Sequence, residues 1–162
     1  MREGLAASEE TNPAFAGSCL YGLLGLIETD RSAREAALAA GEALLAKGAG
    51  GDNHFWFRRY AIEAALLLEE WDATEAHAYA LAKRTAAEPL PLSDLIVARG
   101  RILVRMGRGT ASDEDAKELA ALRVKAAAVD FRLDALRDAL RAARPAPFRD
   151  IRAKASSDRL DP

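Results

Sequence analysis

Side chains that commonly carry enzymatic or metal chemistry are scarce in this chain. Its 162 residues include one cysteine, Cys19, and two histidines, His54 and His77. A single cysteine excludes a disulfide within the chain and favours a reducing compartment. Neither histidine has a Cys, His or carboxylate three or four residues further along the chain, so the spacing of a metal site is missing. We therefore expect no metal, no cofactor and no catalytic residues.

Long hydrophobic runs are also missing. Glu, Arg and Lys interrupt every apolar segment before it approaches 18 residues, so we expect no membrane-spanning helix. The first ten residues lack the apolar stretch of a signal peptide. The net charge of −2 includes no excess of positive charge that would indicate a nucleic-acid partner. The sequence predicts a soluble, cytoplasmic protein without a membrane partner.

Strand patterns are absent too, and helical patterns take their place. β-Branched residues nowhere alternate with polar residues between turn signals, so no strand is predicted. Seven helices are expected instead, at residues 13–28, 32–47, 54–69, 73–87, 93–105, 113–128 and 132–143. The sequence thus predicts an all-α domain over residues 1–143. Pro, Ser and charged residues then predict a poorly ordered tail over residues 144–162.

Several helix ends carry capping signals. Asp30 and Ser112 precede helical patterns, and their side chains can accept hydrogen bonds from free backbone N–H groups of the first turn. The acidic residues that follow Ser112 suit the positive end of a helix dipole. The same reasoning predicts a cap at Asp52 and Asn53, and a helix stop in the glycine-rich segment 48–51.

The breaks between helices recur at an even spacing. Breaks before the first helix of each pair lie 39 residues apart, at Pro13, Asp52 and Pro91. Overlaying the three units aligns small residues, where we expect the paired helix to approach closely: Gly22, Ala61 and Gly100. Two helices per unit of about 34 to 45 residues are typical of tetratricopeptide (TPR) and related repeats. The spacing predicts a right-handed stack of about three antiparallel helical hairpins, a TPR-like α-solenoid, with a C-terminal capping helix. The alternative is a simple α-bundle whose helices have similar lengths.

Four stretches of the chain resemble a known helical region. They read AREAALAAGEALLAKG, NHFWFRRYAIEA, EEWDATEAHAYALAKRTAAEPLPLSD and IVARGRILVRMGRG. They are similar to the TPR-like C-terminal region of bacterial signalling proteins that join a class III adenylate or guanylate cyclase domain to an AAA-type ATPase module. Arg58, Tyr60 and Leu92 depart from the Tyr, Asp and Trp of that family's pattern. The chain contains neither a Walker A loop nor a metal-binding Asp pair. The resemblance therefore implies a regulatory module without cyclase activity, either a fragment or a stand-alone relative.

The third helical pattern carries the best candidates for partner binding. One of its faces combines polar, cationic and aromatic groups at three- and four-residue steps, namely Asn53, Trp56, Arg59, Tyr60 and Glu63. In helical repeats the first helix of each pair lines the concave surface. There an arginine can hold a carboxylate through paired hydrogen bonds while Trp and Tyr bury apolar ligand atoms. With two arginines of the fifth pattern, the predicted partner-binding residues are Asn53, Trp56, Arg59, Tyr60, Arg101 and Arg105.

A less specific interpretation assigns the same residues to packing. Trp56 and Tyr60 would then lie between repeats, and the arginines would be solvated. Cys19 lies in an apolar run and is expected to be a small buried hydrophobic residue, while His77 is expected at the surface.

Together these observations favour a non-enzymatic scaffold that binds a protein or peptide, of acidic character, as a regulatory module in bacterial signalling. Two alternatives remain open. One is a structural module that forms homodimers through the helix predicted at residues 132–143, whose apolar stripe consists of Leu133, Leu136 and Leu140. The other is a small-molecule sensor with a pocket between helices.

Overall fold

The computed structural model describes residues 13–131, and in this part of the chain it is entirely helical. The six helices are α2 (Pro13–Ile27), α3 (Arg31–Ala46), α4 (Gly51–Leu67), α5 (Trp71–Thr85), α6 (Pro91–Gly107) and α7 (Asp113–Ala127). The all-α prediction is confirmed for these residues. The helix predicted at 132–143 and the tail at 144–162 lie outside the described residues.

Two helix starts follow their predicted caps, whereas α4, α5 and α6 begin two or three residues earlier than predicted and have no side-chain cap. Asp30 caps α3 by accepting a hydrogen bond from the Ala33 backbone at 2.8 Å, and Ser112 forms a reciprocal capping box with Asp115 at the start of α7. The predicted cap at Asp52 and Asn53 is wrong, because α4 already begins at Gly51. Its first turn therefore includes Asp52, whose carboxylate suits the positive end of the helix dipole.

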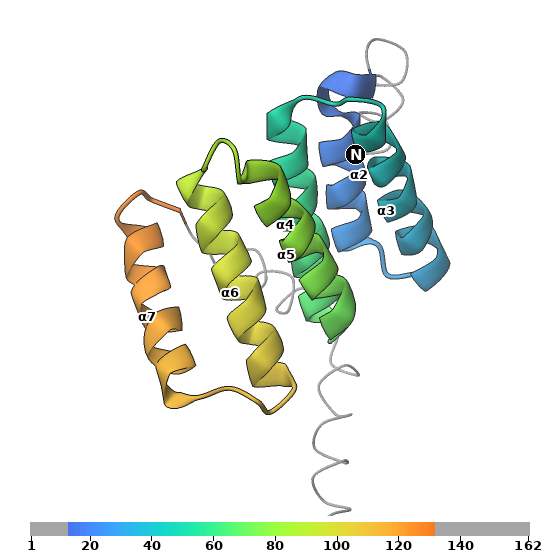
Figure 1. Cartoon of the computed structure of the whole chain (residues 1–162). Coiled ribbons are helices and arrows are strands. Elements are labelled where there is room, and N and C mark those ends of the chain that lie inside the picture. Colours follow the sequence, from blue (N-terminus) through green and yellow to red (C-terminus); the bar gives the residue numbers. More distant parts are fainter. Residues whose placement is uncertain (1–12, 132–162) are drawn as a thin grey trace, which may run out of the picture.

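The helices lie in a row that follows the order of the sequence, from α2 and α3 at one end to α7 at the other (Figure 1). Each helix packs against the next one in the chain. The first helices of the predicted pairs also contact one another, because α2 packs on α4 and α4 packs on α6.

A series of polar contacts joins consecutive parts of this row. Each contact links residues 35 or 36 positions apart, in the pairs Ser18–Asn53, Arg34–Glu70, Glu63–Arg99 and Asp72–Arg108. The sequence overlay gives a repeat of 39 residues, which is longer than the 35 or 36 residues between contacting partners. The two partners of each contact therefore do not occupy equivalent positions in the two units.

Phe57 fills the space where α2, α3 and α4 meet. The residue is 0% exposed, and its ring lies beside the glycines of both preceding helices, Gly22 and Gly41. A Cβ added at Gly22 would lie 3.1 Å from the Phe57 Cα atom. Gly22 thus permits a close approach of α2 to α4.

The sequence overlay expected these small residues to face the paired helix, and this detail is wrong. Gly22 faces α4 rather than its neighbour α3. An added Cβ at Gly100 would lie 3.5 Å from Ile62 of α4 and 3.9 Å from Thr74 of α5. Small residues therefore serve the contacts between successive pairs, which sequence spacing alone does not distinguish from contacts within a pair.

Candidate partner-binding surface

The predicted polar and aromatic face of α4 is buried at both of its ends. Near the start of the helix, Asn53 is 7% exposed and its side-chain oxygen accepts a hydrogen bond from the Ser18 hydroxyl of α2 at 3.0 Å. One turn before the helix ends, Glu63 is 1% exposed and forms an ion pair with Arg99 of α6. These contacts tie α4 to the helices on either side. The prediction that Asn53 binds a partner is therefore not supported by its position.

The middle of the same face is more open and consists of one arginine surrounded by aromatic rings. Trp56 is 37% exposed and stacks on Tyr60, with ring centroids 6.2 Å apart. The Arg59 guanidinium carbon lies 5.3 Å from the Trp56 ring centre, 6.0 Å from that of Tyr60 and 4.7 Å from that of Phe131. We call Trp56, Arg59, Tyr60 and Phe131 the arginine–aromatic patch. The face of an aromatic ring attracts a cation, so the three rings hold the Arg59 guanidinium among them through cation–π contacts.

Burial shifts the ionisation of this patch. Desolvation lowers the pKa of Arg59 and raises the pKa of Tyr60. A guanidinium nevertheless stays charged at neutral pH, because its ordinary pKa lies far above 7. At pH 7 the patch therefore presents one positive charge beside a neutral phenol and an indole.

Arg59 differs from the other arginines that are at least partly buried within residues 17–131. Four of them have a carboxylate partner, in the pairs Arg34–Glu70, Arg58–Glu42, Arg99–Glu63 and Arg105–Asp115. Arg59 has three ring contacts and no ion pair with any described residue. Rings offset part of its charge but leave its five N–H donors without strong acceptors.

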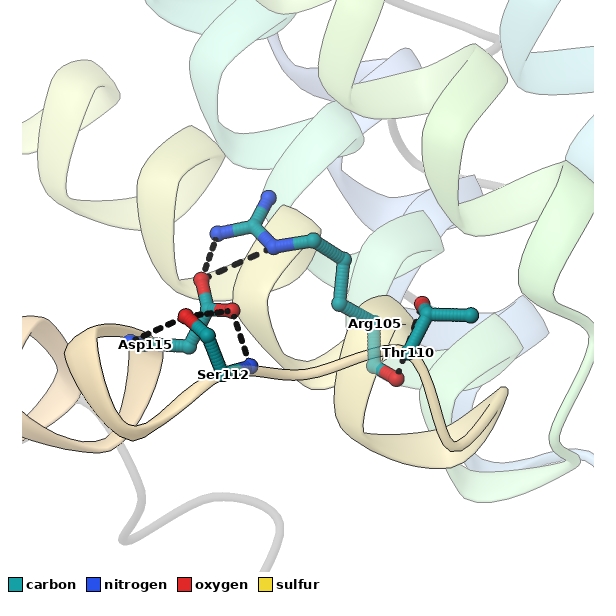
Figure 2. A network of polar contacts seen from close by, with 4 residues as sticks. All are labelled: Arg105, Thr110, Ser112 and Asp115. Carbon is teal, nitrogen blue, oxygen red and sulfur yellow. Dashed lines mark hydrogen bonds and ion pairs between the residues drawn. The ribbon is translucent and has the colours of Figure 1, made fainter.

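Arg105 belongs to an intramolecular network rather than to this surface (Figure 2). Its Nε donates to Asp115 Oδ1 at 2.8 Å, and the other oxygen of Asp115 accepts hydrogen bonds from the Ser112 backbone and hydroxyl. Arg105, followed by the Ser112 backbone, lowers the pKa of Asp115 to about 2. The network joins the end of α6 to the start of α7, which gives Arg105 a structural role; its predicted part in partner binding stays a prediction.

Arg101 is exposed but does not extend the patch. It follows Arg99 by two residues, which corresponds to a rotation of about 200° around a helix. Because Arg99 contacts Glu63 of α4, Arg101 points away from α4. Of the six predicted partner-binding residues, the structure brings Trp56, Arg59 and Tyr60 together in the patch. Asn53 shares their face but is buried against Ser18, Arg105 pairs with Asp115, and Arg101 points away from α4.

Phe131 is the member of the patch that sequence reasoning missed. It follows Asp130, whose φ of 53° lies in the left-handed region. The Phe131 backbone N–H donates to the Ala126 carbonyl at 2.9 Å, and that of Asp130 donates to Ala127 at 3.0 Å. This is the Schellman ending of a helix, in which the chain reverses direction and an apolar residue commonly follows. The reversal places the Phe131 ring over Arg59, a contact that local sequence signals do not reveal.

A second polar cluster lies between α3, α4 and α5. Arg58 Nη2 donates to Glu42 Oε2 at 2.7 Å, and Arg58 Nη1 donates to His77 Nδ1 at 2.8 Å. Burial, followed by the charge of Arg58, lowers the pKa of His77 to about 4. The imidazole is therefore neutral at pH 7, and its separation of 3.7 Å from Glu42 is not an ion pair. The expectation of a surface histidine is wrong, because the His77 side chain is only 16% exposed.

Neither a metal site nor activated cysteine chemistry is found in the described residues. Residues 13–131 contain no group of three or more His, Cys, Asp or Glu side chains that could hold an ion. Burial raises the pKa of the Cys19 thiol, which disfavours the reactive thiolate. Cys19 is partly rather than fully buried. No described helix combines the length and apolar character needed to cross a membrane.

Comparison of the chain with protein-family models, with curated proteins and with solved structures gives no match. The resemblance to the helical region of cyclase-linked signalling proteins therefore remains a prediction.

Proposed function

We propose that this protein is a non-enzymatic, TPR-like scaffold that binds an acidic protein or peptide segment through the arginine–aromatic patch. The observation that carries the proposal is Arg59, a half-buried cation whose described surroundings contain aromatic rings but no paired carboxylate. Burying a charge without a paired counter-charge is unfavourable, so a negatively charged partner would stabilise this arrangement.

The helix contacts support a repeat scaffold. Consecutive helices pack on one another, the first helices of the predicted pairs form the series α2, α4 and α6, and polar contacts recur at intervals of 35 or 36 residues. These features support the proposed right-handed stack of helical hairpins, since each unit of such a stack would contact only its neighbours. By resemblance, the partner would belong to a bacterial signalling assembly in the cytoplasm.

Binding at the patch would combine two forces. A carboxylate of the partner would accept paired hydrogen bonds from Arg59, and charge-assisted bonds of this kind contribute about 1.5–3 kcal/mol each. Apolar partner atoms would bury the exposed part of Trp56, which is a residue type common at interface hot spots. Arg59 would thus supply charge selectivity, and the rings would supply apolar contact area.

A titration with peptides tests the proposal. Fluorescent peptides of equal length, either acidic or with each acidic residue replaced by its amide, are titrated into the full chain. We expect saturable binding of acidic peptides and a loss of about tenfold or more on Arg59→Ala. Arg101→Ala is the matched control, because it removes the same charge from an exposed position that points away from α4. Equal effects of the two substitutions would remove the assignment of the patch.

Self-association through the end of the row is the second candidate. Val124 on α7 is 70% exposed and Val129 just beyond it is 63% exposed, so apolar surface remains open at this end. The leucine stripe predicted at residues 132–143 lies outside the described residues. Light scattering at increasing concentration distinguishes this candidate, since a strict monomer at high concentration would exclude it.

A further inference from the structure

We infer that the arginine–aromatic patch selects a single carboxylate next to a large apolar side chain, and that it discriminates against phosphate groups and polyanions. This inference rests on the proposed function and adds the chemical class of the ligand. It follows from how many positive charges the patch offers, from what surrounds Arg59 and from the surface beside it.

The patch offers one uncompensated positive charge. Neighbouring arginines on α4 and α6 are neutralised within the protein, Arg58 by Glu42 and Arg99 by Glu63. A carboxylate carries one negative charge and would match Arg59, whereas a phosphate monoester carries about −1.5 to −2 at pH 7. The second charge of a phosphate would meet no free cation in the patch. In a partly desolvated site such an unmatched charge opposes binding.

The surroundings of Arg59 also suit a planar anion. Its guanidinium lies over the rings of Trp56 and Phe131, which leaves the N–H groups of the planar fork as the part able to donate. A carboxylate can accept two parallel hydrogen bonds from such a fork. Glu63 and Arg99 act on Arg59 with opposite signs, so their ion pair supplies no second positive charge for an anion.

The surface beside Arg59 is aromatic and held in place. Trp56 is 37% exposed, contacts Phe55 edge-on at 5.1 Å between ring centroids and stacks on Tyr60. Phe55 is 7% exposed and belongs to the core, so the indole has a fixed support. A partner whose carboxylate reaches Arg59 would place its neighbouring residue on this indole. A large apolar neighbour would bury more of the ring than a small or charged one.

Selection from random linear peptides displayed on phage tests this inference against the full chain, with Arg59→Ala as the counter-selection target. We expect enrichment of a single Asp or Glu beside Leu, Phe or Trp. The most enriched peptide is then synthesised with Glu, Gln or phosphoserine at the acidic position. Replacing Glu by Gln should weaken binding by about tenfold or more on the unsubstituted chain and by less than about twofold on Arg59→Ala.

The outcomes separate the inference from the function on which it rests. Tighter binding of the phosphoserine form, or enrichment of tracts of several acidic residues, would overturn the single-carboxylate inference and leave peptide binding intact. No enrichment of any peptide would overturn peptide binding itself.

A second variant, Arg59→Lys, separates a loss of binding from a loss of folding. It keeps the positive charge but lacks the planar guanidinium that can donate two parallel hydrogen bonds. Its circular dichroism should match that of the unsubstituted chain, and its preference for Glu over Gln should be reduced; an unchanged preference would contradict the paired hydrogen bonds.

Discussion

Arg99 of α6 and Glu63 of α4 form a bidentate ion pair in the interior of the protein. Arg99 Nη1 donates to Glu63 Oε1 at 2.6 Å and Nη2 donates to Oε2 at 3.3 Å. The two side chains are 0% and 1% exposed, so neither charge has access to bulk water. Both charges have been desolvated, so the Glu63 carboxylate depends on Arg99 for its counter-charge, and the pair couples the packing of α4 and α6.

Removal of one partner of this pair should be strongly destabilising. We expect Arg99→Ala to lower the free energy of unfolding by about 3–5 kcal/mol, because the Glu63 carboxylate would stay buried without its guanidinium. Urea denaturation measures the change. Glu35→Ala is the control, since its pair with Arg31 is exposed and screened by solvent, so its loss should change stability little. A similar loss of unfolding free energy for both variants would show that the buried pair stabilises the protein no more than the exposed pair does.

Two helical glycines should respond in opposite directions to alanine. At Gly22 the new Cβ would lie 3.1 Å from a backbone atom of Phe57, which cannot move easily, so Gly22→Ala should destabilise the protein through overpacking. At Gly100 the closest atom is 3.5 Å away, an ordinary contact. Gly100→Ala should therefore gain up to about 1 kcal/mol from the higher helix propensity of alanine. Thermal unfolding of both variants checks the signs, and a gain at Gly22 would contradict the close packing of α2 on α4.

Two fully buried serines should also differ. Ser93 Oγ has no hydrogen-bond partner within the described residues, so Ser93→Ala should stabilise the protein, by about 1 kcal/mol, through removal of a desolvated hydroxyl. Ser18 donates to Asn53, so Ser18→Ala should cost about 0.5–1.5 kcal/mol because it removes a buried hydrogen bond between α2 and α4. Chemical denaturation of the two variants side by side measures the difference. Equal losses would mean that the Ser93 hydroxyl is satisfied in solution.

Stability should fall as the pH decreases through the titration range of His77. Its pKa is lowered from an unfolded value of 6.5 to about 4, so the unfolded chain binds a proton more readily than the folded chain. The stabilisation is present in full above pH 6.5 and is lost as the pH falls towards 4. The maximum effect is on the order of 3 kcal/mol, from the equivalence of one pKa unit to 1.36 kcal/mol.

Substitution of His77 isolates this effect. His77→Gln should flatten the dependence of the unfolding free energy on pH between 4 and 6.5, measured by urea titration at several pH values. The titratable and charged groups that face the imidazole are Arg58 and Glu42. Burial also lowers the pKa of His54, so His54→Gln is the matched control and should flatten the curve less. An unchanged curve for His77→Gln would contradict a buried neutral imidazole.

Part of the candidate surface followed directly from helical spacing. Trp56, Arg59 and Tyr60 are separated by three and four residues, and an α-helix of 3.6 residues per turn brings them to one face whatever the rest of the chain does. Spacing alone could not predict which residues of that face would contact other helices of the same protein and which would stay accessible to a partner. Asn53 and Glu63 share the face, yet they contact Ser18 and Arg99 on other helices.

The sequence by itself determined the helical class of residues 13–131, most helix ends and the grouping of Trp56 with Arg59. These features depend on interactions within a few residues, such as the Asp30 and Ser112 caps and the period of the helix. Tertiary structure alone decided that Arg105 pairs with Asp115, that His77 is buried and that Phe131 covers Arg59. Such contacts depend on how separate helices pack against each other. The sequence offers several side chains of the same type for each contact, and only the packing determines which of them makes it.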